Sequence, residues 1–237
     1  MARKKSTGGL TNLERFGGTV FFVFYLLLLP VAAGPAFRLA GELLGRRING
    51  DLQTVIYYYG LFAVTVAVFH RLLGQTTRRF LDNPGLTLKT AGIGFVGLCG
   101  LNELAFRLAG AVSPVRVNLN DTAVSAQMSS APHMTLLILL FLAPFVEEVL
   151  FRGLVFGGLK ERSRGLAYAV SCLLFALLHV WQFALVNRDA AYFLLMAQYM
   201  APGLALAWAY DHAGSLWASI GLHAAANALS ALRYFTG

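Results

Sequence analysis

Residues 134–159, MTLLILLFLAPFVEEVLFRGLVFGGL, form a long apolar run in which the only charged residues are Glu147, Glu148 and Arg152. The run exceeds the roughly 20 residues that a helix needs to cross a bilayer. An ionised carboxylate at membrane depth costs at least about 2.5 kcal/mol, so such residues normally face a bundle interior, have partners and mark function. The segment therefore predicts a membrane-spanning helix with a functional or bracing role for its acids.

The composition of the whole chain indicates the same environment. Of 237 residues, 57% are hydrophobic and 13% are charged, against about 25% charged in soluble domains, and the mean hydropathy is +0.64. Backbone hydrogen bonding in lipid permits helices or closed barrels, and these runs are too long and continuous for barrel strands. We therefore predict an all-α, polytopic transmembrane helical bundle of about seven to eight spans in the cell membrane.

The apolar runs give seven approximate spans, which are residues 17–37, 53–73, 89–112, 134–159, 165–181, 190–210 and 215–234. The polar stretches between them are too short for a separate soluble domain. The chain is therefore expected to be one integral domain, with helices and connections over 1–133 and a second group of helices over 134–237. The long connection from Arg116 to His133 is expected to form a lid or a loop through which substrate enters, because connections of this length usually have a role.

The net charge of +8 is attributed to cytoplasmic loops, which collect Lys and Arg in membrane proteins, and not to nucleic-acid binding. Eleven basic residues fall in the amino-terminal tail and in the second and fourth connections, against six in the alternate connections and the carboxyl end. This asymmetry predicts a cytoplasmic amino terminus. The first connection, with Arg38, Arg46 and Arg47, opposes the assignment and is expected to be an interfacial helix or an extra span.

Helical geometry separates the two adjacent glutamates. At about 100° per residue, Glu148 and Arg152 differ by roughly 40° around the helix axis, whereas Glu147 and Arg152 differ by roughly 140°. Glu148 is therefore expected to pair with Arg152, and Glu147 is expected to face elsewhere. Glu103 and Arg107 repeat the same spacing near the end of their span, and for them we expect a packing brace.

Two later spans carry polar residues at helical spacing. The run FALLH places Phe175 and His179 on one face, and HAAAN does the same for His223 and Asn227. At about 1.5 Å per residue from the expected cytoplasmic ends, both histidines and Glu147 lie at depths of roughly 16–22 Å. These side chains are therefore expected to meet in one layer of the bundle.

The motifs EEVLFR (147–152), FALLH (175–179) and HAAAN (223–227), in this order on successive hydrophobic spans, resemble the CPBP family. This family comprises the CAAX proteases and bacteriocin-processing membrane proteases, and is also called the Abi family. The resemblance covers about residues 134–229, so 134–237 would be the catalytic helical core. It implies an intramembrane endopeptidase that cleaves a membrane-embedded or lipidated peptide or protein tail, for example a prenylated tail or a bacteriocin precursor.

Peptide hydrolysis explains the residue types in these motifs. A carboxylate that is partly stripped of water becomes a better base, and Glu147 is our candidate general base. The resemblance implies that His179 shares the attacking water and that His223 and Asn227 donate hydrogen bonds to the oxyanion. Glu148 and Arg152 would support the helix, as would Phe175.

Three alternatives remain open at this stage. A catalytic zinc ion is the first alternative, with Glu147, His179 and His223 as its possible ligands. The chain has no HExxH motif, however, and Asn227 suits an oxyanion better than zinc. We therefore favour a mechanism without a cofactor. Buried Glu, His and Arg also form proton relays in transporters, but we find no paired repeats. An inactive family member with a regulatory or bacteriocin-immunity role is the third. Nothing in the sequence indicates an oligomeric state.

Overall fold

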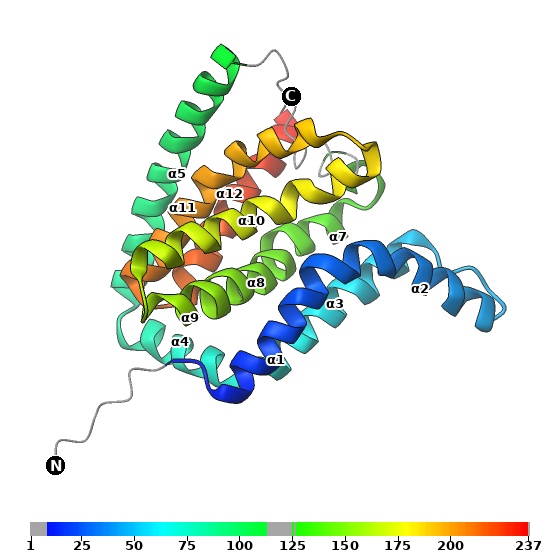
Figure 1. Ribbon diagram of the computed structural model, residues 1–237, viewed down its shortest axis with the longest axis horizontal. Helices are drawn as coiled ribbons and strands as arrows, with labels where there is room; N and C mark the ends of the chain where they lie inside the picture. The colour runs from blue at the N-terminus through cyan, green and yellow to red at the C-terminus, as the bar shows by residue number, and fades with distance from the viewer. Residues whose placement is uncertain (1–8, 113–124, 126, 237) are drawn as a thin grey trace.

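The computed structural model describes residues 9–112, 125 and 127–236, and every regular element within them is a helix. In chain order these helices are α1 (Asn12–Val23), η1 (Phe24–Leu28), α2 (Leu29–Leu43), α3 (Gly50–Val68), α4 (His70–Asp82), α5 (Pro84–Val112), α7 (Pro132–Leu137), η2 (Ile138–Leu142), α8 (Ala143–Glu148), η3 (Val149–Phe156), α9 (Gly157–Lys160), α10 (Arg164–Asn187), η4 (Ala190–Leu195), α11 (Met196–Ala213) and α12 (Leu216–Thr236). Several of these elements run on from one another as single rods, so the bundle has fewer rods than labels (Figure 1).

Six rods within the described part of the chain are long and apolar enough to cross a membrane. They are residues 12–43, 50–68, 84–104, 132–160, 164–187 and 190–213, and a shorter apolar helix covers 216–232. The prediction of a polytopic helical bundle is thereby confirmed. The predicted lid or loop between Arg116 and His133 lies largely outside the described residues.

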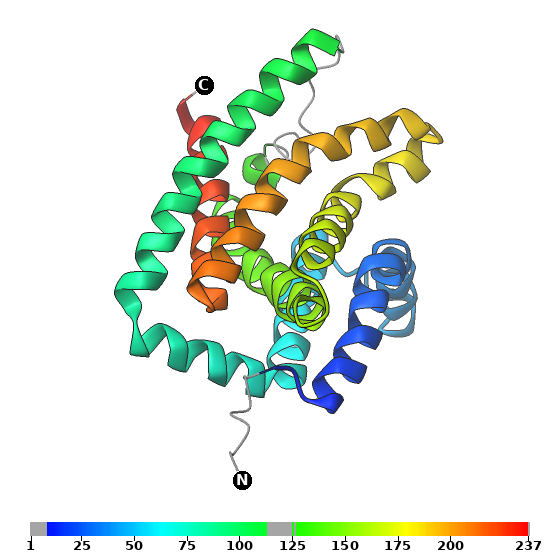
Figure 2. The same cartoon turned by 60° about the vertical axis from the view of Figure 1, so that its left-hand side comes forward.

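The rod that contains α7, η2, α8, η3 and α9 is the centre of the bundle. In its most apolar window 61% of the residues are buried, against 11–33% in the other five candidate spans. Figure 2 looks nearly along this rod and shows the other helices around it. Phe151 and Leu150 are completely buried. The acidic motif therefore lies on the candidate span that has the least contact with lipid.

The helix turns are widened before and after α8, the short segment that carries Glu147 and Glu148. η2 and η3 have the wider hydrogen-bond pattern of a π-helix, and α8 between them is a regular α-helix. Pro144 lies at the start of α8, and its missing N–H breaks the hydrogen-bond ladder there. π-Helical turns are rare and occur often at functional sites.

Helix α4 corrects the predicted connection after the second span. The sequence predicts a connection in the polar stretch that begins at Gly74, but most of this stretch is helical, because α3 ends at Val68 and α4 begins at once. Leu72 and Thr76 face the bundle, whereas Arg71 and Arg78 are exposed. The sequence of α4 is mostly polar because only every third or fourth residue of this helix is buried.

Helix α4 fixes the start of α12, which carries the last motif. The Thr76 hydroxyl oxygen accepts from the backbone N–H of Leu216 at 2.5 Å, and the Ser215 hydroxyl donates to the Thr76 carbonyl at 3.0 Å. The Trp217 indole donates to Thr77 at 2.9 Å. The first of these bonds satisfies a backbone N–H group that a helix start leaves without a partner. Together the three bonds set the position of α12 in the bundle.

A buried carboxylate joins three rods at the same end of the molecule. The Asp211 side chain, in the last turn of α11, forms ion pairs with Lys160 of α9 and Arg164 of α10. It also accepts a hydrogen bond from the Tyr168 hydroxyl at 3.1 Å. The predicted spans leave Asp211 in a connection, whereas the structure makes it a bracing residue. Its partners are 43 to 51 positions away, beyond the reach of any local pattern.

At the opposite end, the first connection is partly helical. α2 continues to Leu43, and a short turn leads to α3 at Gly50, so the region between them contains no extra span. Figure 1 shows α2 projecting away from the rest of the bundle.

Candidate active site

Glu148 is the centre of a buried charge network. Its Oε1 atom accepts from Arg152 Nη1 at 3.0 Å and from His223 Nδ1 at 2.9 Å, and the side chains of Glu148 and Arg152 are fully buried. The pair that the i, i+4 spacing predicted is thus present. The contact with His223 joins the first motif to the last one, and no local spacing predicts it because the two residues are 75 positions apart.

Arg152 reaches two further helices. Its Nη2 atom donates to the backbone carbonyl of Gly203 in α11 at 3.0 Å, and its guanidinium carbon lies 4.5 Å from the centre of the Phe175 ring in α10. A guanidinium over an aromatic face is attracted to it, most strongly when both are removed from water. Arg152 therefore holds η3, α10 and α11 together around Glu148. The supporting role predicted for Phe175 stays a prediction.

Glu147 faces a different part of the interior. It is half-buried, and its Oε2 atom is buried without a hydrogen-bond partner among the described residues. It lies close enough to interact electrostatically with His179 and with the hydroxyl groups of Tyr25, Tyr57 and Tyr58. A carboxylate oxygen without a partner is costly inside a protein. A water or a substrate group would satisfy it.

His179 is held by a hydrogen bond and by ring contacts. Its Nδ1 lies 2.8 Å from the Phe175 carbonyl and, because a carbonyl only accepts, must carry the proton in that bond. In the neutral ring Nε2 is then left as an acceptor. The ring stacks on Tyr199 of α11 with 4.5 Å between centroids and an angle of 25°. His179 therefore has a fixed tautomer and a fixed orientation.

Asn227 is positioned by the break in the central helix. Its Nδ2 atom donates to the Leu139 carbonyl at 2.8 Å. In η2 the N–H of Ala143 bonds the carbonyl five residues earlier, and in the same register Pro144 would pair with Leu139 if it had an N–H. Asn227 thus takes the place of the missing donor, and the second hydrogen on its Nδ2 stays available.

The family assignment follows from the segment that contains these motifs. Residues 129–229 match the family model for the Rce1-like type II CAAX prenyl endopeptidases. Over these residues the chain matches the CPBP family of membrane proteases, to which the Rce1-like proteins belong. Searches of curated proteins and of solved structures found no match. The CPBP proteins of this type are peptide hydrolases, so this protein is a CAAX-type intramembrane endopeptidase with a membrane-associated peptide or protein substrate.

The alternative zinc ligands Glu147, His179 and His223 are not assembled as a metal site in the described part of the chain. Within the described residues, no three side chains of His, Cys, Asp or Glu converge as a group that could hold a metal ion. His223 directs Nδ1 to Glu148 and His179 directs Nδ1 to a backbone carbonyl, so Nε2 is the ring nitrogen that stays open in both residues. Both rings also pack against Phe175, with 5.9 Å and 4.6 Å between the centroids.

The Glu103–Arg107 pair and Tyr199 differ from the sequence expectation. Glu103 and Arg107 form their pair at 2.6 Å, but their side chains are 58% and 76% exposed, so the pair is not a brace between helices. Tyr199, which stacks on His179, was missed as a residue of the site. No local pattern distinguishes it from a packing aromatic, because the contact depends on how α10 and α11 pair.

Proposed function

We propose that this CPBP protein hydrolyses a peptide bond in a membrane-delivered tail with a water molecule activated by Glu147 and His179, without a metal. The observation that carries the proposal is the buried, unpartnered Oε2 of Glu147 in the neighbourhood of a His179 ring whose Nε2 can accept a hydrogen bond. Both groups are acceptors, and water is the donor that satisfies both.

The first step is attack of this water on the scissile carbonyl carbon. Glu147 takes one proton from the water, His179 Nε2 orients the water through the other, and the new C–O bond leaves negative charge on the carbonyl oxygen. Glu147 can take this proton because its Oε2 atom has no hydrogen-bond partner among the described residues.

The oxyanion would be bound by His223 and Asn227. Glu148 accepts the Nδ1–H of His223 at 2.9 Å, and an imidazolium held in this way donates from Nε2 as well. The second N–H of Asn227 supplies the other bond. Preorganised donors of this kind contribute about 3 to 4 kcal/mol each in characterised hydrolases.

The second step returns the proton to the leaving group. When the tetrahedral intermediate collapses, the C–N bond breaks and the amine nitrogen takes the proton held by Glu147. The products are a new carboxyl terminus and a free amine, and Glu147 is again ionised. Glu148 and Arg152 take no part in proton transfer, because their charges pair with each other.

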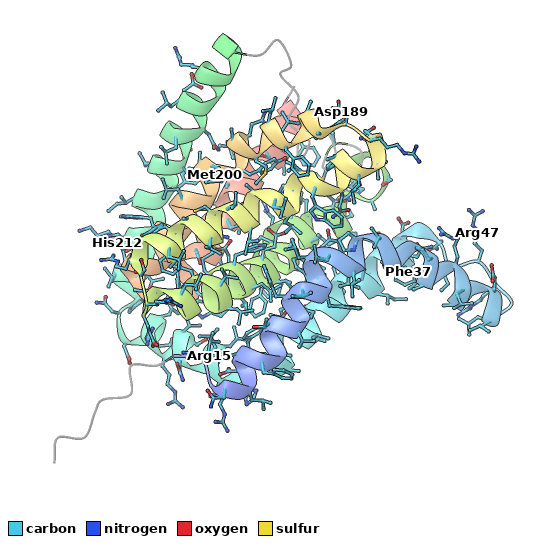
Figure 3. The ribbon with its side chains drawn as sticks, viewed as in Figure 1. Arg15, Phe37, Arg47, Asp189, Met200 and His212 are labelled. Atoms are coloured by element: carbon cyan, nitrogen blue, oxygen red, sulfur yellow. The ribbon has the colours of Figure 1, made fainter. Side chains whose placement is uncertain are left out.

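We further propose that the substrate is a prenylated or otherwise lipidated tail, or a bacteriocin-type precursor. We also propose that the protein lies in the cell membrane with its amino terminus in the cytoplasm. Figure 3 shows Arg15 and His212 toward one end of the bundle and Asp189 and Arg47 toward the other. Arg15 contacts Glu161 at 3.7 Å, and Arg79 bonds the Gly214 carbonyl at 3.0 Å, which gathers basic residues of separate segments at the first end. Basic residues concentrate on the cytoplasmic side.

The test uses the purified protein in liposomes with a farnesylated CAAX-type peptide and the same peptide without the lipid. Mass spectrometry of the products identifies the cleaved bond. We expect cleavage of the lipidated peptide by the wild type and by the surface control Glu161→Gln, and loss of cleavage in His179→Ala with the protein still inserted. Equal cleavage by His179→Ala and the wild type would contradict the proposed water site.

A further inference from the structure

A hollow lies at the far end of α2, and none of the candidate catalytic residues lines it. Its volume is about 560 Å³, and its lining includes Arg38, Arg46 and Arg47, together with Glu42 and Gln53. In Figure 3 Phe37 and Arg47 mark this region on the projecting end of α2. The hollow is therefore not an extension of the site around Glu147.

The turn after α2 brings the three arginines to one hollow. Gly45 adopts a left-handed backbone conformation with φ of +63°, its N–H bonds the Glu42 carbonyl at 3.1 Å, and the N–H of Arg46 bonds the Gly41 carbonyl at 3.1 Å. These two bonds form a Schellman motif, which reverses the chain at a helix end. A Cβ on Gly41 would lie 3.0 Å from the carbonyl oxygen of Arg46, so the small residue permits the reversal.

The hollow carries an uncompensated positive charge. The three arginines and Glu42 give a net charge of two units, and no ion pair between these arginine side chains and a carboxylate occurs in the described residues. The planar guanidinium group matches a phosphate in geometry and binds it through two hydrogen bonds. An anionic ligand with phosphate oxygens therefore fits the lining.

The surroundings indicate that this phosphate belongs to a lipid. The hollow lies at the end of the apolar span 12–43, and beside it Leu39, Leu43 and Leu44 are 58%, 80% and 62% exposed. We propose that the hollow binds the headgroup phosphate of an acidic phospholipid such as phosphatidylglycerol, with the acyl chains along the exposed leucines of α2. Lipid binding here is independent of the peptidase reaction.

The probe for this site is dioleoylphosphatidylglycerol, with dioleoylphosphatidylcholine as the neutral competitor. The full-length protein is equilibrated with mixtures of the two lipids in detergent, and bound lipid is counted by native mass spectrometry. A basic residue near a membrane surface contributes about fivefold to the binding of acidic lipid. We therefore expect Arg38→Gln/Arg46→Gln/Arg47→Gln to lose about 100-fold in apparent affinity for phosphatidylglycerol.

A matched control removes the same charge elsewhere. Arg71→Gln/Arg78→Gln/Arg162→Gln alters three exposed arginines and should stay within about threefold of the wild type. Equal losses in the two triple variants would overturn the proposal, since they would show a general effect of charge.

A gain of binding excludes simple damage to the fold. Glu42→Gln removes the carboxylate from the lining and should raise the affinity about fivefold, which an unfolded variant cannot do. Unchanged or lower affinity in this variant would count against the site. Glycerol 3-phosphate at the lipid concentration should not displace the lipid. If glycerol 3-phosphate or inorganic phosphate displaces the lipid, the site binds a soluble phosphate and the assignment to a lipid is wrong.

Discussion

Arg152→Ala tests how far the buried charge network supports the fold. The substitution removes the bond to Glu148 at 3.0 Å, the bond to the Gly203 carbonyl at 3.0 Å and the contact with the Phe175 ring at 4.5 Å. It leaves Glu148, whose side chain has no exposed surface, with His223 as its remaining partner. Breaking a buried ion pair in this way costs about 3 to 5 kcal/mol.

The expected loss is large enough to measure by thermal unfolding in detergent. For a chain of this size 1 kcal/mol corresponds to roughly 2 to 4 °C in Tm, so the expected decrease is roughly 6 to 20 °C. Arg107→Ala is the control, because Arg107 also pairs with a glutamate four residues earlier but is 76% exposed. Exposed pairs contribute little to stability, and this variant should unfold at almost the wild-type temperature.

A double variant separates charge from shape. Arg152→Met with Glu148→Gln removes both buried charges, and the amide oxygen introduced beside His223 can still accept its hydrogen bond. We expect the double variant to regain at least about half of the lost stability, because replacing a buried pair by neutral residues is often close to neutral. An Arg152→Ala protein as stable as wild type, or a double variant less stable than Arg152→Ala, would refute the reasoning.

Three further outcomes are expected. Asn227→Ala should lower kcat by about 10² to 10³ with KM little changed, because the hydrogen bond to the oxyanion strengthens in the transition state. Asn227→Asp should be no more active. Steady-state kinetics with the lipidated peptide measures kcat and KM of both variants. Thr76→Val leaves the buried N–H of Leu216 without an acceptor, which costs about 1 to 3 kcal/mol and should appear as a lower unfolding temperature at unchanged insertion. Prolonged dialysis against a chelator, followed by elemental analysis, should leave activity intact; activity that is lost with zinc and restored by adding zinc would contradict the metal-free mechanism.

The parts of the site that could be predicted from sequence are those set within one helix. Glu148 and Arg152 pair because residues four apart share a face, and Phe175 and His179 are close for the same reason. The apolar runs located the spans because lipid demands long helices.

The contacts that could not be predicted join different helices. His223 and Glu148 are 75 residues apart, and Asn227 and Leu139 are 88 residues apart. The second contact also depends on a π-helical register. In a regular α-helix Pro144 would free the carbonyl of Leu140, whereas Asn227 bonds that of Leu139. Such local widening follows from packing and has no sequence signal that we recognise.

The central claim is that the carboxylate of Glu147 acts as the base, and chemical rescue tests it most directly. Glu147→Ala removes the carboxylate and leaves space for a small anion, whereas Glu147→Gln fills the same space with a group that cannot take a proton. Cleavage of the farnesylated peptide is measured in both variants as formate is added. We expect both to be inactive without formate and only Glu147→Ala to regain activity in proportion to formate. Near-normal cleavage by Glu147→Gln, or no response of Glu147→Ala to formate, would contradict the account.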